Sequence, residues 1–384
     1  MNNFEFVNPT KLVFGKGTIA QLANLIPVSK KVMITFGGGS VKSNGVYEQV
    51  KDALKNHTCI EFWGIEPNPK YETLLKAIKI GREENVDILL AVGGGSVVDG
   101  TKFIAAAIPY TKGEAWDIIK DNSLVESTVP LADVITLPAT GSEMNNGAVI
   151  SRDETKEKYA FFANTNFPVF SILDPEVTYS LPKFQIACGV VDTFVHVVEQ
   201  YLTIPVHTRL MDRWAEGVLQ TLVEIAPELR KEASDYDTMS EFMLSATMGL
   251  NGFIAMGVAQ DWATHMIGHE LTALHGLTHG VTLAIVYPAV LRVMREQKQV
   301  KLLQYGERVW GIHDGSVEER IEKTIEATEN FFRQMGLQTR LSEVNVGQET
   351  INEIVSRFSK RAMVLGECEN ITPEVVRQIL NSAK

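Results

Sequence analysis

The stretch Asp87-Ile-Leu-Leu-Ala-Val-Gly-Gly-Gly-Ser96 decides the fold of this chain. The segment Asp87–Val92, with its apolar run Ile88–Val92, predicts a short, fully buried strand, and the glycines that follow it end the strand. The next residues, Val98–Ala107, have the composition and periodicity of a helix. A buried strand joined to a helix by a tight glycine turn is the repeating unit of a parallel sheet that carries helices on its faces.

The same alternation of strand and helix extends through the first half of the chain. The further elements expected there are strands over 31–36, 58–63 and 133–137 and helices over 46–55 and 70–84. Strands that alternate with helices in this way predict a parallel sheet covered on both faces. The N-terminal part is therefore expected to be an α/β domain.

Strand signals fade after about Leu181, and long helical patterns replace them. These patterns cover 185–201, 210–232, 238–257 and 261–273 and continue to the end of the chain. We place the boundary near Tyr179–Lys183. The chain of 384 residues is thus expected to contain an α/β domain over 1–180 and an all-helical domain over 181–384.

Composition excludes several classes of partner. The formal net charge of −11 leaves no basic face large enough to hold nucleic acid. The cysteines Cys59, Cys188 and Cys368 are scattered, which argues against a disulfide framework and against a thiolate zinc site. No basic-then-apolar leader and no apolar run of membrane-spanning length are seen. We therefore expect a cytoplasmic protein with no membrane partner.

The glycine string Gly93–Ser96 predicts an anion site. Glycines let a bulky anion approach the backbone, and the free amides at the start of the following helix point at it. The physics is that of a pyrophosphate cradle, although the string is not the GxGxxG fingerprint. A tight turn without a ligand explains the glycines equally well. Asp99 in the first helical turn also suits the helix dipole on purely structural grounds.

A second string, Gly37–Ser40, ends the strand expected over 31–36. Enzymes that prefer NAD often place an acid near the ribose 2′-hydroxyl. The segment Phe36–Lys42 contains no acid but offers backbone amides, Ser40 and Lys42, which suit a 2′-phosphate. If a dinucleotide binds here, NADP fits better than NAD. The alternative is a flexible loop with a solvated lysine.

Histidines and one aspartate in the helical half form a metal-ligand pattern. Asp192 and His196 are four residues apart, as are His265 and His269, so each pair shares one helix face. His279 follows after an expected helix break at Gly276. An aspartate with three histidines suits Fe²⁺ or Zn²⁺. Spacing alone does not decide which of the histidines from His265 to His279, including His275, are ligands, and a helical histidine is often structural.

Taken together, the motifs resemble those of the iron-containing (group III) alcohol dehydrogenases over essentially the whole chain. They are Gly93-Gly-Gly-Ser-Val-Val-Asp99, Asp192-x-x-x-His196 and His265-x-x-x-His269-x(9)-His279-Gly280. The strings Leu137–Asn145 and His269–His279 resemble the butanol dehydrogenase branch of NADPH-dependent aldehyde reductases. The resemblance implies a dinucleotide-binding domain, a helical metal-binding domain and a cleft between them.

The resemblance assigns the metal ligands as Asp192, His196, His265 and His279. It implies that His269 lies near the metal and the nicotinamide without binding the metal. His269 is therefore the candidate catalytic residue, either as a proton relay, because histidine can exchange protons around neutrality, or as a residue that only orients a ligand or the cofactor.

The resemblance also implies cofactor contacts for NADP(H). Together with the loop discussed above, the expected cofactor residues are Gly37, Gly38, Ser40, Lys42, Asn68, Gly94, Gly95, Ser96, Asp99, Thr136, Thr140, Asn145 and Lys158. NAD-preferring members carry an aspartate where Gly37 stands here. The segment Pro138–Glu143 is shorter than usual for the family, Thr101 replaces the usual alanine, and Thr278 replaces a frequent proline.

The function that follows is hydride transfer between NADP(H) and a primary alcohol or aldehyde, such as butanol or butyraldehyde, with one Fe²⁺ or Zn²⁺. Two alternative functions fit the sequence less well. A lyase related to dehydroquinate synthase would need a basic cluster around the histidines, which is not seen. A non-enzymatic, metal-dependent binding protein would not explain the two glycine loops. Dimers are common in the family, and an exposed edge within the extended segment Phe4–Phe14 suits a homodimer.

Overall fold

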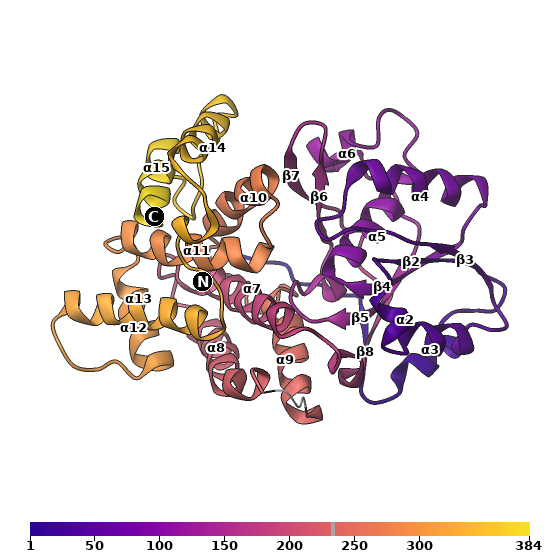
Figure 1. Cartoon of the computed structure of the whole chain (residues 1–384), viewed down its shortest axis with the longest axis horizontal. Coiled ribbons are helices and arrows are strands. Elements are labelled where there is room, and N and C mark those ends of the chain that lie inside the picture. Colours follow the sequence, from indigo (N-terminus) through magenta and orange to yellow (C-terminus); the bar gives the residue numbers. More distant parts are fainter. Residues whose placement is uncertain (232–234) are drawn as a thin grey trace. The chain divides into compact units, whose positions relative to one another are not determined.

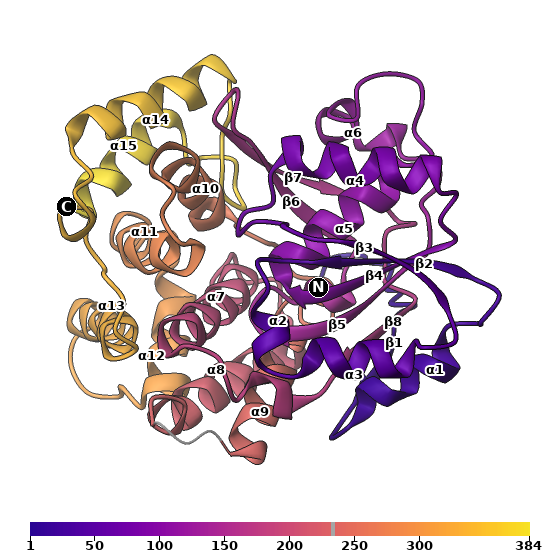
Figure 2. The same cartoon turned by 45° about the vertical axis from the view of Figure 1, so that its right-hand side comes forward.

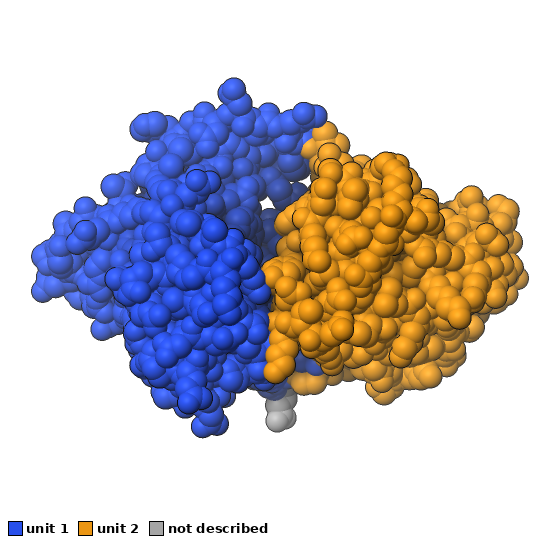
Figure 3. Space-filling model, turned by 90° about the horizontal axis from the view of Figure 1, so that it is seen from above, with its two compact units in different colours: residues 1–6, 183–232, 248–384 blue, residues 7–182, 233–247 orange. Residues whose placement is uncertain are grey.

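The computed structural model describes residues 1–231 and 235–384, which form two compact units (Figures 1 and 3). Unit 1 consists of residues 1–6, 183–232 and 248–384, and unit 2 of residues 7–182 and 233–247. Two short segments therefore belong to a different unit from the residues that flank them in sequence.

Unit 2 is built on a six-stranded sheet whose registered pairs are all parallel. In spatial order the strands are β1 (Lys11–Phe14), β8 (Phe170–Leu173), β5 (Leu131–Leu137), β4 (Ile88–Gly94), β2 (Lys31–Phe36) and β3 (Thr58–Phe62). The strand expectations over 31–36, 58–63, 87–92 and 133–137 are thus confirmed to within two residues.

Helices cover both faces of this sheet (Figure 2). They are α1 (Leu22–Leu25), α2 (Ser40–Ser43), α3 (Val46–Ala53), α4 (Tyr71–Glu83), α5 (Gly95–Ala107) and α6 (Asp117–Lys120). Successive residues of β4 feed opposite cores: Leu89 packs toward the side of α4 and α5, and Leu90 toward the side of α1 and α3. Burial on both faces explains why the strand sequence is uniformly apolar rather than alternating.

Thr101 lies where α5 packs against the sheet. Thr101 is fully buried, and its Oγ1 lies 2.5 Å from Oγ1 of Thr35 on β2. It also donates to the carbonyl of Val97 at 2.6 Å. The hydroxyl of Thr101 therefore has partners on both elements, as a buried polar group requires.

Sequence reasoning missed part of unit 2. The antiparallel hairpin of β6 (Gly147–Arg152) and β7 (Glu157–Phe162) was not expected, and neither was β8. Strand β8 has only four residues, too few to show a period. Strand β1 lies within the segment expected to be extended, and it forms one edge of the sheet.

Unit 1 is helical, as expected. Its helices are α7 (Lys183–Tyr201), α8 (Arg209–Leu229), α10 (Ala263–His275), α11 (His279–Val293), α12 (Gln299–Trp310), α13 (Val317–Gln334), α14 (Gln348–Lys360) and α15 (Pro373–Ser382). Helix α9 (Tyr236–Gly249) spans the change from unit 2 to unit 1. Within the described residues, no helix combines the length and apolar character needed to cross a bilayer.

Two helix expectations need correction. The helix expected over 238–257 ends at Gly249, because Gly252 and Gly257 take positive φ angles of 85° and 69° and turn the chain. The helix expected over 210–232 ends at Leu229, and the last predicted residue, Glu232, lies outside the described residues.

Candidate functional site

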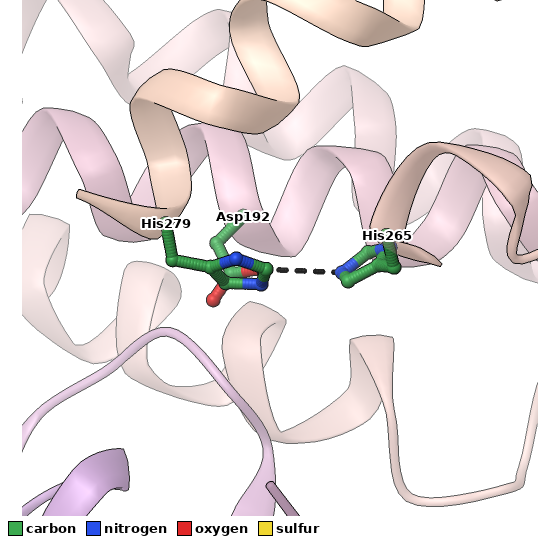
Figure 4. Close-up of side chains that lie close together, drawn as sticks. All are labelled: Asp192, His265 and His279. Carbon is green, nitrogen blue, oxygen red and sulfur yellow. Dashed lines mark ion pairs between the residues drawn. The ribbon is translucent and has the colours of Figure 1, made fainter. Parts of the chain in front are cut away.

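Three helices of unit 1 bring the predicted metal ligands together (Figure 4). Asp192 projects from the middle of α7, His265 from the first turn of α10, and His279 is the first residue of α11. Gly276, at a φ of 67°, ends α10 and lets the chain turn into α11. The helix break expected at Gly276 is thus present, and it carries His279 back toward His265.

Three imidazole nitrogens converge on one carboxylate oxygen. Oδ1 of Asp192 lies 3.4 Å from Nε2 of His196, 3.6 Å from Nε2 of His265 and 3.6 Å from Nε2 of His279. Asp192, His196 and His265 are buried, whereas the side chain of His279 is 23% exposed. The ligand atoms of Asp192, His265 and His279 all lie within 4.8 Å of one another, and His196 joins this group through Asp192.

This donor set fits a divalent metal ion. Bonds of 2.0–2.2 Å in a tetrahedral arrangement place two ligand atoms about 3.4 Å apart, close to the nitrogen–oxygen distances in the cluster. The Nε2 atom of His265 is buried and makes no hydrogen bond to any residue that the structure describes. One carboxylate with imidazoles is a donor set that suits iron and zinc alike.

Glu199, which sequence reasoning missed, orients His265. One oxygen of its buried carboxylate pairs with Nδ1 of His265, and the other accepts a hydrogen bond from the amide of Thr264 at 2.6 Å. With Nδ1 engaged, Nε2 is the atom that faces Asp192. Such an outer partner fixes the ring and raises the basicity of the ligand. Its sequence signal was its position seven residues after Asp192, on the same face of α7.

A glycine lets α11 approach α7. A Cβ at Gly280 would lie 2.7 Å from both Cα and the carbonyl oxygen of Cys188 on α7. Real Cβ atoms essentially never come so close to backbone. Because Gly280 follows His279 directly, this contact sets how near His279 comes to Asp192.

His269 lies beside the cluster. Its side chain is buried, and its ring centroid is 5.4 Å from that of His279 and 6.4 Å from that of His265. His196 and His265 stack with centroids 4.6 Å apart. The four-residue spacing on α10 thus places His269 near the predicted ligands. His275 lies at the end of α10, where its Nε2 is 2.8 Å from Oγ1 of Thr350 on α14.

The buried charges of the cluster shift its proton affinities in opposite directions. Burial lowers the pKa of His196 to about 4, with His265 adding to this and Asp192 opposing it. Burial also lowers the pKa of His265, but Glu199 and Asp192 outweigh it and raise the value to about 9. The carboxylates of Asp192 and Glu199 therefore create a site that favours positive charge.

In unit 2, the two glycine strings lie next to each other at the carboxyl ends of strands β2 and β4. Strands β2 and β4 are parallel neighbours with Phe36 opposite Val92, so the glycines that follow them lie side by side. A Cβ at Gly37 would lie 3.4 Å from a methyl group of Val97, next to Ser96. Ligands of open α/β sheets bind at such carboxyl ends.

The turn from β4 to α5 has no room for side chains. A Cβ at Gly95 would lie 2.4 Å from Oγ1 of Thr140, and one at Gly94 would lie 3.1 Å from Cβ of Leu137. Thr140, one of the expected cofactor residues, therefore packs against this turn. Helix α5 opens at Gly95, so its first amides are at the predicted cradle.

Three other predicted cofactor residues form a chain of hydrogen bonds. The amide of Asn68 donates to Oγ of Ser96 at 3.3 Å, and Nζ of Lys158 donates to Oδ1 of Asn68 at 2.8 Å. Asn68 takes a left-handed backbone conformation with a φ of 57°. Residues far apart in sequence thus meet beside the start of α5.

Asp99 and Asn145 are held by internal contacts. Asp99 accepts from Oγ of Ser142 at 2.7 Å and from the amide of Val149 at 2.9 Å. Asn145 accepts from the buried ammonium of Lys102 at 3.0 Å through its side-chain oxygen. These bonds make Asp99 and Asn145 part of the scaffold of the loop. Thr136 is buried near the end of β5.

The buried Lys102, which sequence reasoning missed, ties this loop to α5. Besides Asn145, it donates to Oγ of Ser142 and to the carbonyl of Gly147. Burial lowers the pKa of Lys102 to about 8, and nearby carboxylates oppose that shift.

Gly38, Ser40 and Lys42 lie in the second loop. A Cβ at Gly38 would meet no atom within 4 Å, so the backbone there is open. Ser40 and Lys42 belong to the short helix α2.

Comparisons with known proteins agree with this arrangement. The family models described as "Iron-containing alcohol dehydrogenase" and "Fe-containing alcohol dehydrogenase family, C-terminal" match residues 9–175 and 186–384. The "NADPH-dependent aldehyde reductase YqhD" of Escherichia coli (strain K12) is 53% identical over 387 residues, with all of both chains covered. The "Probable NADH-dependent butanol dehydrogenase 1" of Bacillus subtilis (strain 168) is 38% identical, also over all of both chains.

A solved structure is similar throughout. The crystal structure of E. coli K-12 YqhD superposes with a TM-score of 0.98 at 52% identity and covers 100% of this chain and 99% of its own. Because both halves match their family models and a full-length relative is 53% identical, the chain belongs to the iron-containing alcohol dehydrogenase family.

Proposed function

We propose that this protein is a metal-dependent oxidoreductase that transfers a hydride between NADP(H) and a primary alcohol or aldehyde, such as butanol or butyraldehyde. The observation that carries the proposal is the convergence of three imidazoles on the buried carboxylate of Asp192. A buried carboxylate surrounded by histidines in this way is a site for a divalent ion.

When bound, the divalent ion would supply Lewis acidity and NADPH would supply the hydride. The residues of the chain hold and orient these groups. Asp192, His196, His265 and His279 would hold the ion, and Glu199 keeps the His265 ring in place. His269, buried beside His279, is the proposed proton carrier for the alcohol oxygen.

The proposed cofactor site lies at the carboxyl ends of β2 and β4. Gly94, Gly95 and Ser96 would receive the pyrophosphate at the start of α5. The loop Gly37–Lys42 would receive the adenosine ribose, where a lysine and no acid favour a 2′-phosphate. The remaining proposed contacts are Asn68, Asp99, Thr136, Thr140, Asn145 and Lys158. Some relatives are named for NADPH and others for NADH, so the relatives' names do not decide the cofactor. The composition of the loop Gly37–Lys42 is what supports NADP(H) for this chain.

Metal removal and re-addition test the function. Chelation should abolish aldehyde-dependent oxidation of NADPH, and Fe²⁺ or Zn²⁺ should restore it. Elemental analysis of the purified protein would identify which metal it carries, since the donor set suits both. Full activity in verified metal-free protein would refute the proposal. For the cofactor, kcat/KM should be higher for NADPH than for NADH, and a clear preference for NADH would overturn the interpretation of Gly37–Lys42.

We also propose a homodimer in a reducing, cytoplasmic setting. Strand β1 is an outer strand of the six-stranded sheet and pairs within that sheet with β8 alone, so its other side suits pairing with another copy of the chain. Cys59, Cys188 and Cys368 are free thiols. Light scattering on the purified protein tests the dimer, and a monomeric mass at micromolar concentration would contradict it.

A further inference from the structure

An aromatic cluster underlies the proposed ribose loop in unit 2. The rings of Phe36, at the end of β2, and Trp63, directly after β3, stack with centroids 4.0 Å apart and planes 14° apart. Tyr47 on α3 packs against both rings, at 5.7 Å from Phe36 and 5.6 Å from Trp63. Phe36 is fully buried and immediately precedes the glycines of the loop, so the cluster is a fixed base for them.

Lys42 rests on this cluster. Its ammonium lies 4.0 Å from the centroid of the Trp63 ring and 5.7 Å from that of Tyr47. Since the Phe36 ring covers one face of the indole, the ammonium occupies the other. Within the described residues, the Lys42 ammonium makes no hydrogen bond and no ion pair, so the rings are its contacts, while the backbone amide of Lys42 donates to the carbonyl of Gly39. A cation over an indole is attracted by the negative face of the ring.

Glu61 on β3 fixes the orientation of the rings. Its carboxylate accepts hydrogen bonds from Nε1 of Trp63 at 2.9 Å, from the hydroxyl of Tyr47 at 3.1 Å and from Nζ of Lys51 at 2.9 Å. The Lys51 ion pair offsets the charge of this carboxylate. The charge of Lys42 is therefore left available for a ligand.

We propose that Trp63 is a specificity-determining residue for NADPH, which positions the Lys42 ammonium for the 2′-phosphate of the adenosine ribose. The inference rests on the proposed function, in which Gly37–Lys42 receive that ribose. An exposed lysine side chain samples many rotamers, and holding it over a ring reduces the entropy lost on binding. NADH has a hydroxyl at this position and gains little from the ammonium. Trp63 thus acts on the choice between the cofactors, through Lys42.

Stacking of the adenine on Trp63 is the competing role. The indole faces Phe36 on one side and Lys42 on the other, so an adenine would have to displace the lysine. The two roles predict different selectivity. A stacking residue affects NADH and NADPH equally, whereas a residue that positions Lys42 affects only the ligand that carries the 2′-phosphate.

The experiment measures binding of two nucleotides to the purified, metal-loaded protein by calorimetry. The probes are adenosine 2′,5′-bisphosphate and adenosine 5′-monophosphate, and kcat/KM for NADPH and NADH is measured in parallel. The variants are Trp63→Leu, Trp63→Phe and Lys42→Met. Lys55→Met is the matched control, because it removes an exposed lysine that pairs with Asp52.

Trp63→Leu should weaken binding of the bisphosphate about threefold to tenfold. Trp63→Phe keeps an aromatic ring under the ammonium and should retain most of the wild-type affinity. Lys42→Met, which keeps the rings intact, should weaken it by about tenfold or more. Trp63→Leu should have little further effect in the Lys42→Met background, because the two residues act as a unit. Binding of the monophosphate and kcat/KM for NADH should fall by a clearly smaller factor than the values for the bisphosphate and NADPH, and every value for Lys55→Met should match the wild type.

Equal losses for the two nucleotides in Trp63→Leu would overturn the inference, and so would an unchanged affinity for the bisphosphate in Trp63→Leu or Lys42→Met. In both cases aldehyde reduction with NADPH would persist, and the proposed function would stand. A wild-type protein that oxidises no NADPH with any aldehyde would instead refute the proposed function.

Discussion

In unit 1, three helices place side chains around one oxygen of Asp192, whereas in unit 2 the end of β4 is lined by residues that lack side chains. The metal cluster consists of side-chain donor atoms, whereas the turn at Gly94 and Gly95 offers backbone amides and has no room for side chains. Deleting a side chain should therefore destroy the metal cluster, while adding one should destroy the glycine turn. The comparison teaches that both sites demand close packing but fail in opposite ways.

The largest effect is expected for Asp192→Ala. The change removes the oxygen that lies 3.4–3.6 Å from three imidazoles and leaves these imidazoles without a common anion. Metal affinity should fall by more than about a hundredfold, the upper range seen for outer partners of ligands. Aldehyde reduction should be lost with it. Elemental analysis after dialysis measures the first effect, and an NADPH assay the second.

The comparison requires that Asp192→Ala leave unit 2 intact. Its affinity for NADPH, followed by fluorescence, should match the wild-type value. His313→Ala, at an exposed position on the same unit, is the control and should keep metal and activity. A variant that retains stoichiometric metal would show that Asp192 is not a ligand.

The converse change is Gly95→Ala in unit 2. The added Cβ would lie 2.4 Å from Oγ1 of Thr140, so the turn or the loop around Thr140 must shift. A shift of this size at a binding turn should cost on the order of a hundredfold in kcat/KM for NADPH. Metal content should be unchanged. Loss of metal in Gly95→Ala would contradict the separation of the two sites.

A compensating change sharpens this test. Thr140→Ala removes two of the three atoms nearest to the added Cβ, namely Oγ1 and Cγ2. In the Gly95→Ala background it should therefore recover part of the loss. An effect of Gly95→Ala that is independent of Thr140 would point away from crowding at this contact.

Glu199→Gln tests whether the metal cluster depends on more than its ligands. The amide is nearly isosteric but carries no charge, so it would hold His265 more weakly and lower its basicity. Metal affinity should fall about 10-fold to 100-fold, in the range found for such partners. Competition with a chelator of known affinity measures it. NADPH affinity should not change, and an unaltered metal affinity would assign Glu199 a purely structural role.

Much of both sites was predictable from local pattern. Strands β2 and β4 are confirmed because burial on both faces left an uninterrupted apolar run that ended in glycine. The spacing of Asp192 and His196, and of His265 and His269, identified side chains that share a helix face, and the structure brings them near one another. In these cases the information lies within a few residues of the chain.

The parts that escaped prediction depend on contacts between distant segments. Glu199 shares the face of Asp192 on α7, but its partner His265 lies 66 residues away. From sequence alone, Lys102 would be expected on the surface, whereas the structure buries it beneath the loop that contains Ser142 and Gly147. Trp63 directly follows β3 and Lys42 lies on α2, and no spacing rule joins them. Tertiary packing decides these positions, and one sequence does not display it.

The smallest effect is expected for Gly280→Ala, which tests the comparison where it is weakest. The metal cluster also depends on a missing side chain, because a Cβ at Gly280 would lie 2.7 Å from the backbone of Cys188. Helix α11 would move away from α7 and carry His279 with it, so metal affinity should fall about tenfold, at the low end of the range for indirect changes.

The matched control is Gly217→Ala on α8, where the added Cβ meets no atom within 4 Å. That change should raise the free energy of unfolding by about 0.5–1 kcal/mol through helix propensity. A melting temperature that falls in Gly280→Ala and rises in Gly217→Ala would show that packing between α7 and α11 decides the outcome. Equal changes in melting temperature and metal affinity in the two variants would show that the metal cluster depends on side chains alone.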